Sequence, residues 1–348
     1  MDTAKEIRKG EELDWEQLEI YLRTNLPEKT QGFMKVSQFH GGHANLTYLI
    51  KFPTSELIVR RPPFGKIAPG AHDMKREYRV LSKLYKSFPK APRAYLFCDD
   101  TSIIGSPFVV LERKQGVVVR YELLDCFKGF ENAEERLTTA MIKATAQLHT
   151  VDIEKADLTK LGRPEGFLQR QLSGWAKRYE LSKIEDNKAM EETYALLSAN
   201  VPTPQAVSII HNDIKLDNCQ FQPDNPDKVT AVFDWDMATL GDPLADIGST
   251  LSYWYEPFFE GYDMPVALSK TFPNKTFLIE KYAEFTGFSM EHIDWYHAFA
   301  YWKGAVVGQQ LYGRFLNGES KDERMKKFGT SAKVGGLFAK KILEGNDG

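Results

Sequence analysis

The chain has 348 residues, of which 42% are hydrophobic, and a formal net charge of −3. This length predicts two lobes with a full globular core, while the short basic segment 321–327 is too limited to make nucleic acid a main partner. No apolar run approaches the ~18 residues of a membrane helix. Three widely spaced cysteines argue against a disulfide framework or a zinc site, and the charged segment 1–19 is unlike a signal peptide, so we expect a cytoplasmic protein.

The first predicted element is a β-hairpin at 39–50, where Gly41 and Gly42 lie between two alternating segments. Glycines allow the backbone to approach phosphate groups closely, and successive N–H groups can form an anion-binding nest. A Gly-Gly pair in a hairpin is also consistent with an ordinary turn. The sequence has no G-x-x-x-x-G-K-[ST] motif, which excludes a P-loop NTPase.

A strand and a helix are predicted next. The segment 57–61 is expected to form a strand that ends at two prolines. The apolar pattern from about 74 to 86 predicts a helix with Asp73 as its N-cap. Glu77 lies one turn before the apolar face of this helix. Its carboxylate is consistent with a solvated helix charge and with a partner for a cation on the preceding strand.

The middle of the chain is predicted to be a buried strand followed by helices. Residues 108–112 form the apolar strand, and the polar stretch 112–116 after it is the expected lobe boundary. Beyond that boundary, apolar periodicity predicts an amphipathic helix over 134–150 and further helix over 165–200.

Three short strands are predicted around a cluster of polar residues in the second half. His211, Asp213 and Asn218 follow the first of these strands, and Asp234 follows the third. The strands are expected at 206–210, 219–222 and 229–233, with a turn at 223–227. The hairpin between the last two returns Asp234 to the side of Asn218, where two oxygen ligands would suit Mg²⁺. In isolation these residues could be ordinary loop formers.

The order of these residues is that of a kinase catalytic loop, H-R-D-x-x-x-x-N, with its downstream metal-binding Asp. The stretch 211–218, together with 233–246, resembles the aminoglycoside phosphotransferase family. More narrowly, it is similar to the kinase-like modules fused to, or encoded near, acyl-CoA dehydrogenases. The resemblance spans roughly 30–320. Asn212 replaces the usual Gly of the family, and Asn tolerates the left-handed backbone conformation that Gly adopts.

The resemblance implies an α+β, protein-kinase-like fold with two lobes. A small β-rich lobe at 1–112 would bind the nucleotide, with a hinge at about 112–116. A larger, mainly helical lobe at 113–348 would carry the catalytic residues and the acceptor site. ATP and Mg²⁺ are the implied cosubstrate and metal.

Roles in the catalytic loop also follow from the resemblance. Asp213 would be the catalytic base, and His211 would orient the loop through a backbone hydrogen bond. Lys215 would contact phosphate, although a loop lysine is also consistent with simple solvation. Asp246 would accept backbone N–H groups of the loop, or would serve as a charge at a helix N-terminus. The implied Mg²⁺ ligands are Asn218 and Asp234, with Asp236 supporting the loop.

The nucleotide site is expected in the N-terminal lobe. Arg60 would replace the phosphate-binding lysine of protein kinases and pair with Glu77; strand parity favours Arg60 over Arg61. The remaining implied contacts come from the hairpin loop and from hinge backbone atoms, at Gly41, Gly42, Asn45, Glu112 and Lys114.

The acceptor site is expected in the helical remainder of the chain. The aromatic stretch 253–259 is interpreted mainly as core and alternatively as a wall of the acceptor pocket. A helix over 301–314 would place Lys303, Gln310 and Arg314 near one another, and Arg314 could bind an anionic acceptor or form a structural salt bridge. Positive charges here favour a neutral or anionic acceptor, such as a hydroxyacyl thioester by family analogy, over an aminoglycoside.

The function indicated is ATP- and Mg²⁺-dependent transfer of a phosphoryl group to a hydroxyl of a small molecule. The alternative is a catalytically silent, nucleotide-binding module, because Arg60 replaces the kinase lysine. A protein kinase is disfavoured, since the chain has no A-P-E segment and little room for an activation loop between Asp234 and Asp246. The sequence does not indicate an oligomeric state.

Overall fold

The computed structural model describes residues 4–40, 45–65, 72–260, 262, 269–319 and 323–345. The chain divides into two compact units. Unit 1 comprises 1–119, 151–161 and 216–238, and unit 2 comprises 120–150, 162–215 and 239–348. This division differs from the two continuous segments expected at 1–112 and 113–348.

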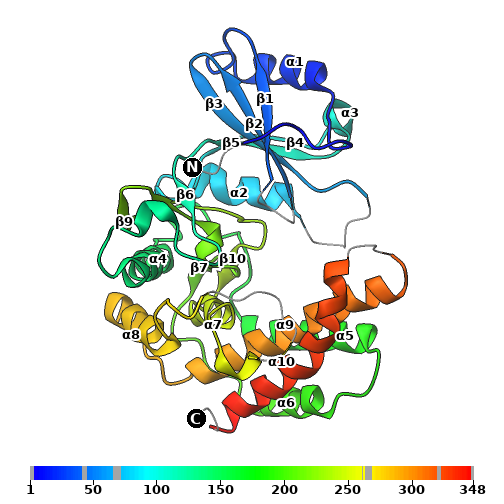
Figure 1. Cartoon of the computed structure of the whole chain (residues 1–348), viewed down its shortest axis with the longest axis vertical. Coiled ribbons are helices and arrows are strands. Elements are labelled where there is room, and N and C mark those ends of the chain that lie inside the picture. The colour runs from blue at the N-terminus through cyan, green and yellow to red at the C-terminus, as the bar shows by residue number, and fades with distance from the viewer. Residues whose placement is uncertain are drawn as a thin grey trace. The chain divides into compact units, whose positions relative to one another are not determined.

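The main feature of unit 1 is an antiparallel sheet with the strand order β1-β2-β3-β5-β4 (Figure 1). Along β2, every second side chain is buried, as expected for a strand with one face against a core. Leu18 and Leu22 of helix α1 (Trp15–Asn25) belong to that core. The strands are β1 (Lys35–Phe39), β2 (Leu46–Phe52), β3 (Ser55–Arg61), β4 (Ala94–Cys98) and β5 (Phe108–Glu112).

Helix α2 (Met74–Leu84) begins where its capping residue predicts. The carboxylate of Asp73 accepts a hydrogen bond from the backbone N–H of Arg76 at 3.0 Å, which satisfies a free donor of the first turn. The buried face of α2 includes Glu77 together with apolar residues. A carboxylate is therefore held inside unit 1, where it needs a cationic partner.

A second sheet explains why unit 1 includes residues far along the chain. Strand β6 (Val117–Val118) pairs with β8 (Cys219–Gln222), which pairs with β9 (Asn225–Val232). Strand β9 starts four residues earlier than the predicted 229, because the turn needs only Pro223 and Asp224. Pro226 is tolerated because β9 lies at the edge of this sheet, where a missing N–H donor costs little.

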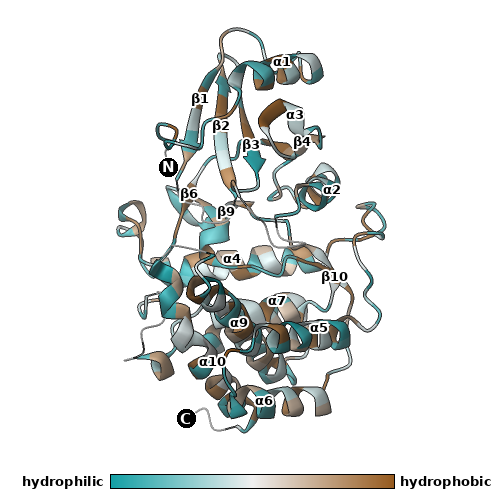
Figure 2. Ribbon diagram, turned by 90° about the vertical axis from the view of Figure 1, so that its right-hand side faces the viewer, coloured by the Kyte–Doolittle hydropathy of each residue, from teal (hydrophilic) through white to brown (hydrophobic). Residues whose placement is uncertain are grey.

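Unit 2 is mainly helical in its described residues (Figure 1). The predicted helical segment 165–200 consists of α5 and α6, separated by a loop in which Asn187 caps α6. Helix α6 contains both hydrophilic and hydrophobic residues (Figure 2), and its buried residues Met190, Thr193 and Leu197 recur at the three-to-four-residue spacing of one helix face. The helices are α4 (Ala133–His149), α5 (Phe167–Ser182), α6 (Lys188–Ala199), α7 (Leu244–Ser252), α8 (Lys275–Thr286), α9 (Ile293–Leu316) and α10 (Phe328–Leu343).

The close approach of α7 to α9 depends on Gly248. A Cβ atom at this position would lie 2.5 Å from the backbone of Tyr296, so a larger residue would force the two helices apart. Strands β7 (Ser208–Ile210) and β10 (Thr239–Gly241) pair antiparallel in the same unit. None of the described helices is both long and apolar enough to cross a membrane.

Candidate active site

Asp246, in the first turn of α7, holds the loop that follows β7. Its carboxylate accepts hydrogen bonds from the backbone N–H groups of His211, at 2.7 Å, and Asn212, at 2.6 Å. It also lies 3.1 Å from Nε2 of the buried His149. Burial alone would raise the pKa of Asp246, but the hydrogen bond from His149 and the backbone donor hold that pKa below its usual value. The structural role predicted for Asp246 is therefore present.

The backbone of Asn212 has a φ of +68°. This left-handed conformation is the one that the Gly-to-Asn departure predicts, since Asn adopts it more readily than most side chains. The turn at Asn212 leads to Asp213. Further along the loop, the hydroxyl of Thr250 on α7 donates to the carbonyl of Ile214 at 2.9 Å. Helix α7 thus fixes the loop at two points on either side of Asp213.

The carboxylate of Asp213 is buried and has a donor on each oxygen. The phenol of Tyr253 donates to Oδ1 at 2.5 Å, and the ammonium of Lys215 lies 3.2 Å from Oδ2. Lys215 also lies over the ring of Tyr253, 4.8 Å from its centroid. Lys215 therefore pairs with Asp213 within unit 2.

Tyr253 is the residue that sequence reasoning missed. The sequence favours core for the stretch 253–259, with a pocket wall as the alternative. Trp254 is buried, but Tyr253 is 39% exposed, lines the cavity described below and contacts Asp213, a contact that neither interpretation predicts. A signal for this contact exists in the sequence. Tyr253 caps the C-terminus of α7 in a helical backbone conformation and follows Asp246 by seven residues, so its side chain is on the same side as Asp246, two turns further along.

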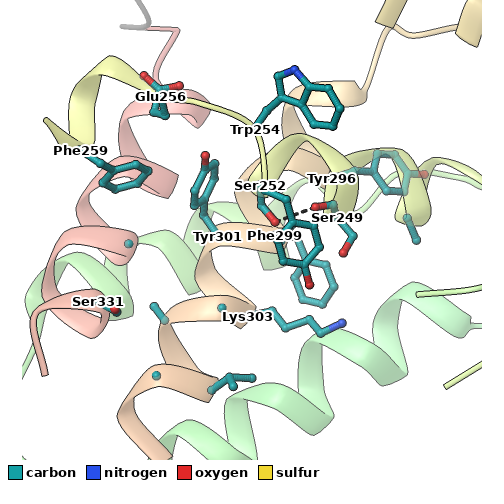
Figure 3. A pocket seen from close by; sticks show the side chains of 18 of the residues that line it. Ser249, Ser252, Trp254, Glu256, Phe259, Tyr296, Phe299, Tyr301, Lys303 and Ser331 are labelled. Atoms are coloured by element: carbon teal, nitrogen blue, oxygen red, sulfur yellow. Dashed lines mark hydrogen bonds between the residues drawn. The ribbon is translucent and has the colours of Figure 1, made fainter. Parts of the chain in front are cut away.

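A cavity of about 550 Å³ lies in unit 2 next to this loop (Figure 3). Asn212 and Lys303, the latter on α9, form part of its wall. Burial lowers the pKa of Lys303, while the negative charge of Asp213 acts in the opposite direction. A large part of the remaining wall is aromatic, with contributions from Phe167, Tyr253, Trp254, Tyr255, Phe259, Tyr262, Tyr296, Phe299, Tyr301 and Phe328.

In unit 1, Arg60 forms two ion pairs, of which the one with Glu77 is buried and the one with Asp234 is partly buried. Its Nη1 lies 2.6 Å from Oε1 of Glu77, and its Nη2 lies 2.7 Å from Oδ1 of Asp234. Burial raises the pKa of Glu77 to about 7, and the charge of Arg60 offsets this only in part. Arg61 points elsewhere: its Nη1 donates to the carbonyl of Ile104 at 3.0 Å. Strand parity favoured Arg60 as the partner of Glu77, and in the structure Arg60, not Arg61, contacts Glu77.

Asn218 and Asp234 lie side by side in unit 1. The backbone N–H of Phe233 donates to the carbonyl of Asn218 at 2.9 Å, which places the next residue, Asp234, close to Asn218. Asp234 has a φ of +72°, a strained conformation for a residue with a side chain. Carboxylate and amide oxygens are donors that fit Mg²⁺. In the described parts of the chain, no group of three or more His, Cys, Asp or Glu side chains could hold a metal ion.

A family model described as "Phosphotransferase enzyme family" matches residues 35–271. The chain belongs to this family. It is 31% identical over 352 residues to acyl-CoA dehydrogenase family member 11 of Gallus gallus, covering 98% of this chain and 44% of that protein. The chain therefore spans less than half the length of this relative.

Two solved structures have the same fold as this phosphotransferase. A protein of Ralstonia eutropha JMP134, assigned as an aminoglycoside phosphotransferase, has a TM-score of 0.80 and 28% identity, with 96% of this chain and 99% of that chain covered. Choline kinase of Cryptosporidium parvum Iowa II has a TM-score of 0.66 at 14% identity, covering 96% and 97%. The predicted α+β, kinase-like fold is thereby confirmed.

The residues predicted to bind the nucleotide through the hairpin loop and the hinge have different surroundings in this phosphotransferase. Gly41 and Gly42 lie outside the described residues. Asn45 is buried, and no described group hydrogen-bonds its side-chain amide. The N–H of Glu112 already donates to the carbonyl of Arg93 at 2.8 Å, so this donor is engaged within the sheet. The carboxylate of Glu112 pairs with the ammonium of Lys114 at 3.0 Å.

The two cations predicted for the acceptor site are separated. Lys303 lines the cavity, whereas Arg314 does not contribute to its wall. Eleven residues separate them, which is a rise of roughly 16 Å along α9. Arg314 instead lies 3.7 Å from the carboxylate of Glu319, and its side chain is 42% exposed. The salt-bridge alternative for Arg314 is the arrangement present in the structure.

Proposed function

We propose that this member of the family is an ATP- and Mg²⁺-dependent phosphotransferase that moves the γ-phosphoryl group to a hydroxyl of a small molecule. The observation that carries the proposal is the placement of Asp213. A loop fixed by Asp246 holds its buried carboxylate, and Asn212 beside it lines a cavity large enough for a small-molecule acceptor.

The nucleotide side of the proposal rests on the ion-pair cluster of unit 1. Arg60 would contact phosphate oxygens, and Glu77 would keep the guanidinium oriented from behind. Asn218 and Asp234 would hold Mg²⁺, which, when bound, neutralises charge on the phosphates. The predicted contacts of Gly41, Gly42 and Asn45 with the phosphates, and those of the Glu112–Lys114 backbone with the base, remain part of this proposal.

On the acceptor side, Asp213 would orient the acceptor hydroxyl and receive its proton. The acceptor oxygen forms the new bond to the γ-phosphorus while the bond from that phosphorus to the departing ADP breaks. Lys215 would stabilise the ionised form of Asp213 and the negative charge of the phosphates. Asp213 and Asn218 are five residues apart, which is the spacing of the kinase loop.

The lining of the cavity favours a neutral or anionic acceptor with an apolar body. Glu256, one acidic residue of the wall, pairs with Lys275 at 2.5 Å, and Glu260 accepts a hydrogen bond from Tyr255. Lys303 adds a cation among the aromatic rings. A polycationic aminoglycoside would meet this charge unfavourably, whereas a hydroxyacyl thioester or a similar metabolite would not. The resemblance to acyl-CoA dehydrogenase family members also supports an acyl thioester as the class of acceptor.

A catalytically silent nucleotide-binding module is the alternative, because Arg60 replaces a kinase lysine. Such a module would bind MgATP and release no Asp213-dependent product. The presence of a buried carboxylate base beside a cavity favours the enzyme.

The nucleotide half of the proposal is tested by measuring MgATP affinity calorimetrically for Asp234→Asn. Binding by the wild type should weaken when EDTA removes Mg²⁺, and Asp234→Asn should lose about tenfold or more in affinity with Mg²⁺ present, because one oxygen ligand loses its charge. Asp224→Asn, in the turn between β8 and β9, is the matched control and should bind as the wild type does. Equal MgATP affinity of Asp234→Asn and wild type would refute the metal assignment.

A further inference from the structure

The hydrogen bond between Tyr253 and Asp213 has the geometry that the reaction requires of the acceptor. A general base must lie within hydrogen-bond distance of the oxygen whose proton it takes, and a hydrogen bond from a hydroxyl to a carboxylate is about 2.5–2.7 Å long. The phenol oxygen of Tyr253 lies 2.5 Å from Oδ1 of Asp213 and donates to it. A hydroxyl of the protein itself therefore occupies the position at which the acceptor hydroxyl would have to bind.

We propose that Tyr253 is a placeholder for the acceptor: its phenol occupies the hydroxyl position at Asp213, keeps water out, and is displaced when the acceptor binds. The inference rests on the proposed function. It makes Tyr253 a residue that discriminates between acceptors, because water and the substrate hydroxyl must both compete with the phenol for Oδ1 of Asp213.

The surroundings of Tyr253 fit displacement. Lys215 is charged and the phenol of Tyr253 is neutral, so of these two donors to Asp213 the phenol is the one that an incoming hydroxyl replaces at lower cost. Tyr253 follows the last residue of α7 and is 39% exposed, so its ring is not locked into the core. It also lines the cavity, together with Ser249 and Ser252 of the same helix. A displaced phenol can thus remain in the wall of the acceptor site.

The consequence concerns water as an unwanted acceptor. If water binds to Asp213, its oxygen attacks the γ-phosphorus, the bond to ADP breaks, and phosphate is released in place of a phosphorylated product. The phenol prevents this while the cavity holds no acceptor. Replacing Tyr253 with Phe keeps the ring and its contact with Lys215 but opens the hydroxyl position to water.

The test is ADP release from MgATP in the absence of any organic acceptor, with MgATP binding measured on the same samples. Tyr253→Phe should hydrolyse ATP about tenfold faster than the wild type, and Tyr253→Leu, which also removes the hydroxyl, should do the same. Adding Asp213→Asn to Tyr253→Phe should remove the gain. Tyr121→Phe, an exposed tyrosine that does not line the cavity, is the matched control and should leave hydrolysis unchanged.

A loss of folding or of loop order cannot imitate this result, because the expected change is a gain of activity. Hydrolysis by Tyr253→Phe and Tyr253→Leu at or below the wild-type rate, with normal MgATP binding, would overturn the placeholder role and leave the phosphotransferase standing. If the wild type fails to bind MgATP, the proposed function itself fails, and the inference fails with it.

Discussion

Arg60 uses two nitrogen atoms for two carboxylates, a task that a lysine could not perform in the same way. The planar guanidinium reaches Glu77 through Nη1 and Asp234 through Nη2, whereas an ammonium is a single point charge on a flexible stem. The arginine therefore joins α2 to Asp234, the proposed metal ligand, within unit 1. This bridging role gives a physical reason for the departure from the kinase pattern.

Glu77 makes the stability of unit 1 depend on pH. The unfolded chain releases this proton near pH 4.5 and the folded chain holds it to about pH 7. Between these values the folded state binds more protons, so the free energy of unfolding falls as the pH rises, by about 3 kcal/mol in total at about 1.4 kcal/mol per pH unit. Glu77→Gln has no carboxyl to titrate and should lack this slope.

The measurement is urea unfolding of both proteins between pH 5 and 8, followed by the fluorescence of the native tryptophans. Wild-type stability should fall through pH 5–7 relative to that of Glu77→Gln and then run parallel to it. Parallel curves over the whole range would show that Glu77 is ionised throughout and that burial does not govern its pKa.

Residue spacing predicted the backbone hydrogen bonds of the loop after His211, but it did not predict which side chains lie around Asp213 and the cavity. The pattern from His211 to Asp246 is local in sequence, and Asp246 forms the predicted backbone hydrogen bonds. The contact of Tyr253 with Asp213 and the removal of Arg314 from the cavity depend on how helices pack, which no short motif records. Aromatic stretches are ambiguous because rings serve in cores and in ligand pockets alike.

At the scale of elements, α9 supports both packing and the acceptor cavity. Gly308 packs tightly: a Cβ there would lie 3.1 Å from Cβ of Ser331 on α10. Gly304, one turn earlier, also lines the cavity, but an added Cβ would meet no described atom within 4 Å. A side chain at Gly304 can therefore be added without disturbing α10, and it would occupy space in the cavity.

Gly304→Leu should keep its fold and lose acceptor binding. Removing a helix-interior glycine should raise stability by roughly 0.5–1 kcal/mol, MgATP affinity should stay unchanged, and phosphoryl transfer into a metabolite extract should fall at least tenfold. Gly174→Leu is the matched control, since Gly174 also has open space on a helix but lies outside the cavity wall. Undiminished transfer by Gly304→Leu would mean that the acceptor binds elsewhere.

At the scale of the whole molecule, residues of the kinase-like motif fall in both compact units. The boundary falls between Lys215 and Leu216, so Asp213 belongs to unit 2, while Asn218 and Asp234 belong to unit 1. The sequence predicted two lobes but placed the whole motif in the second, because a chain position does not reveal that β8 pairs with β6. Strand pairing over about a hundred residues is a tertiary property.

The central claim is that Asp213 accepts the proton of a small-molecule hydroxyl while the phosphoryl group of ATP is transferred. The most direct test follows label from γ-³²P-ATP with Mg²⁺ into a small-molecule extract, comparing the wild type with Asp213→Ala. The wild type should form a labelled compound, whose mass identifies the acceptor. Asp213→Ala should bind MgATP normally and lower the rate of labelling by about 10²–10⁴-fold. Equal labelling by both proteins would contradict the role of Asp213 as the base, and binding of MgATP without any labelled product would favour the silent nucleotide-binding module.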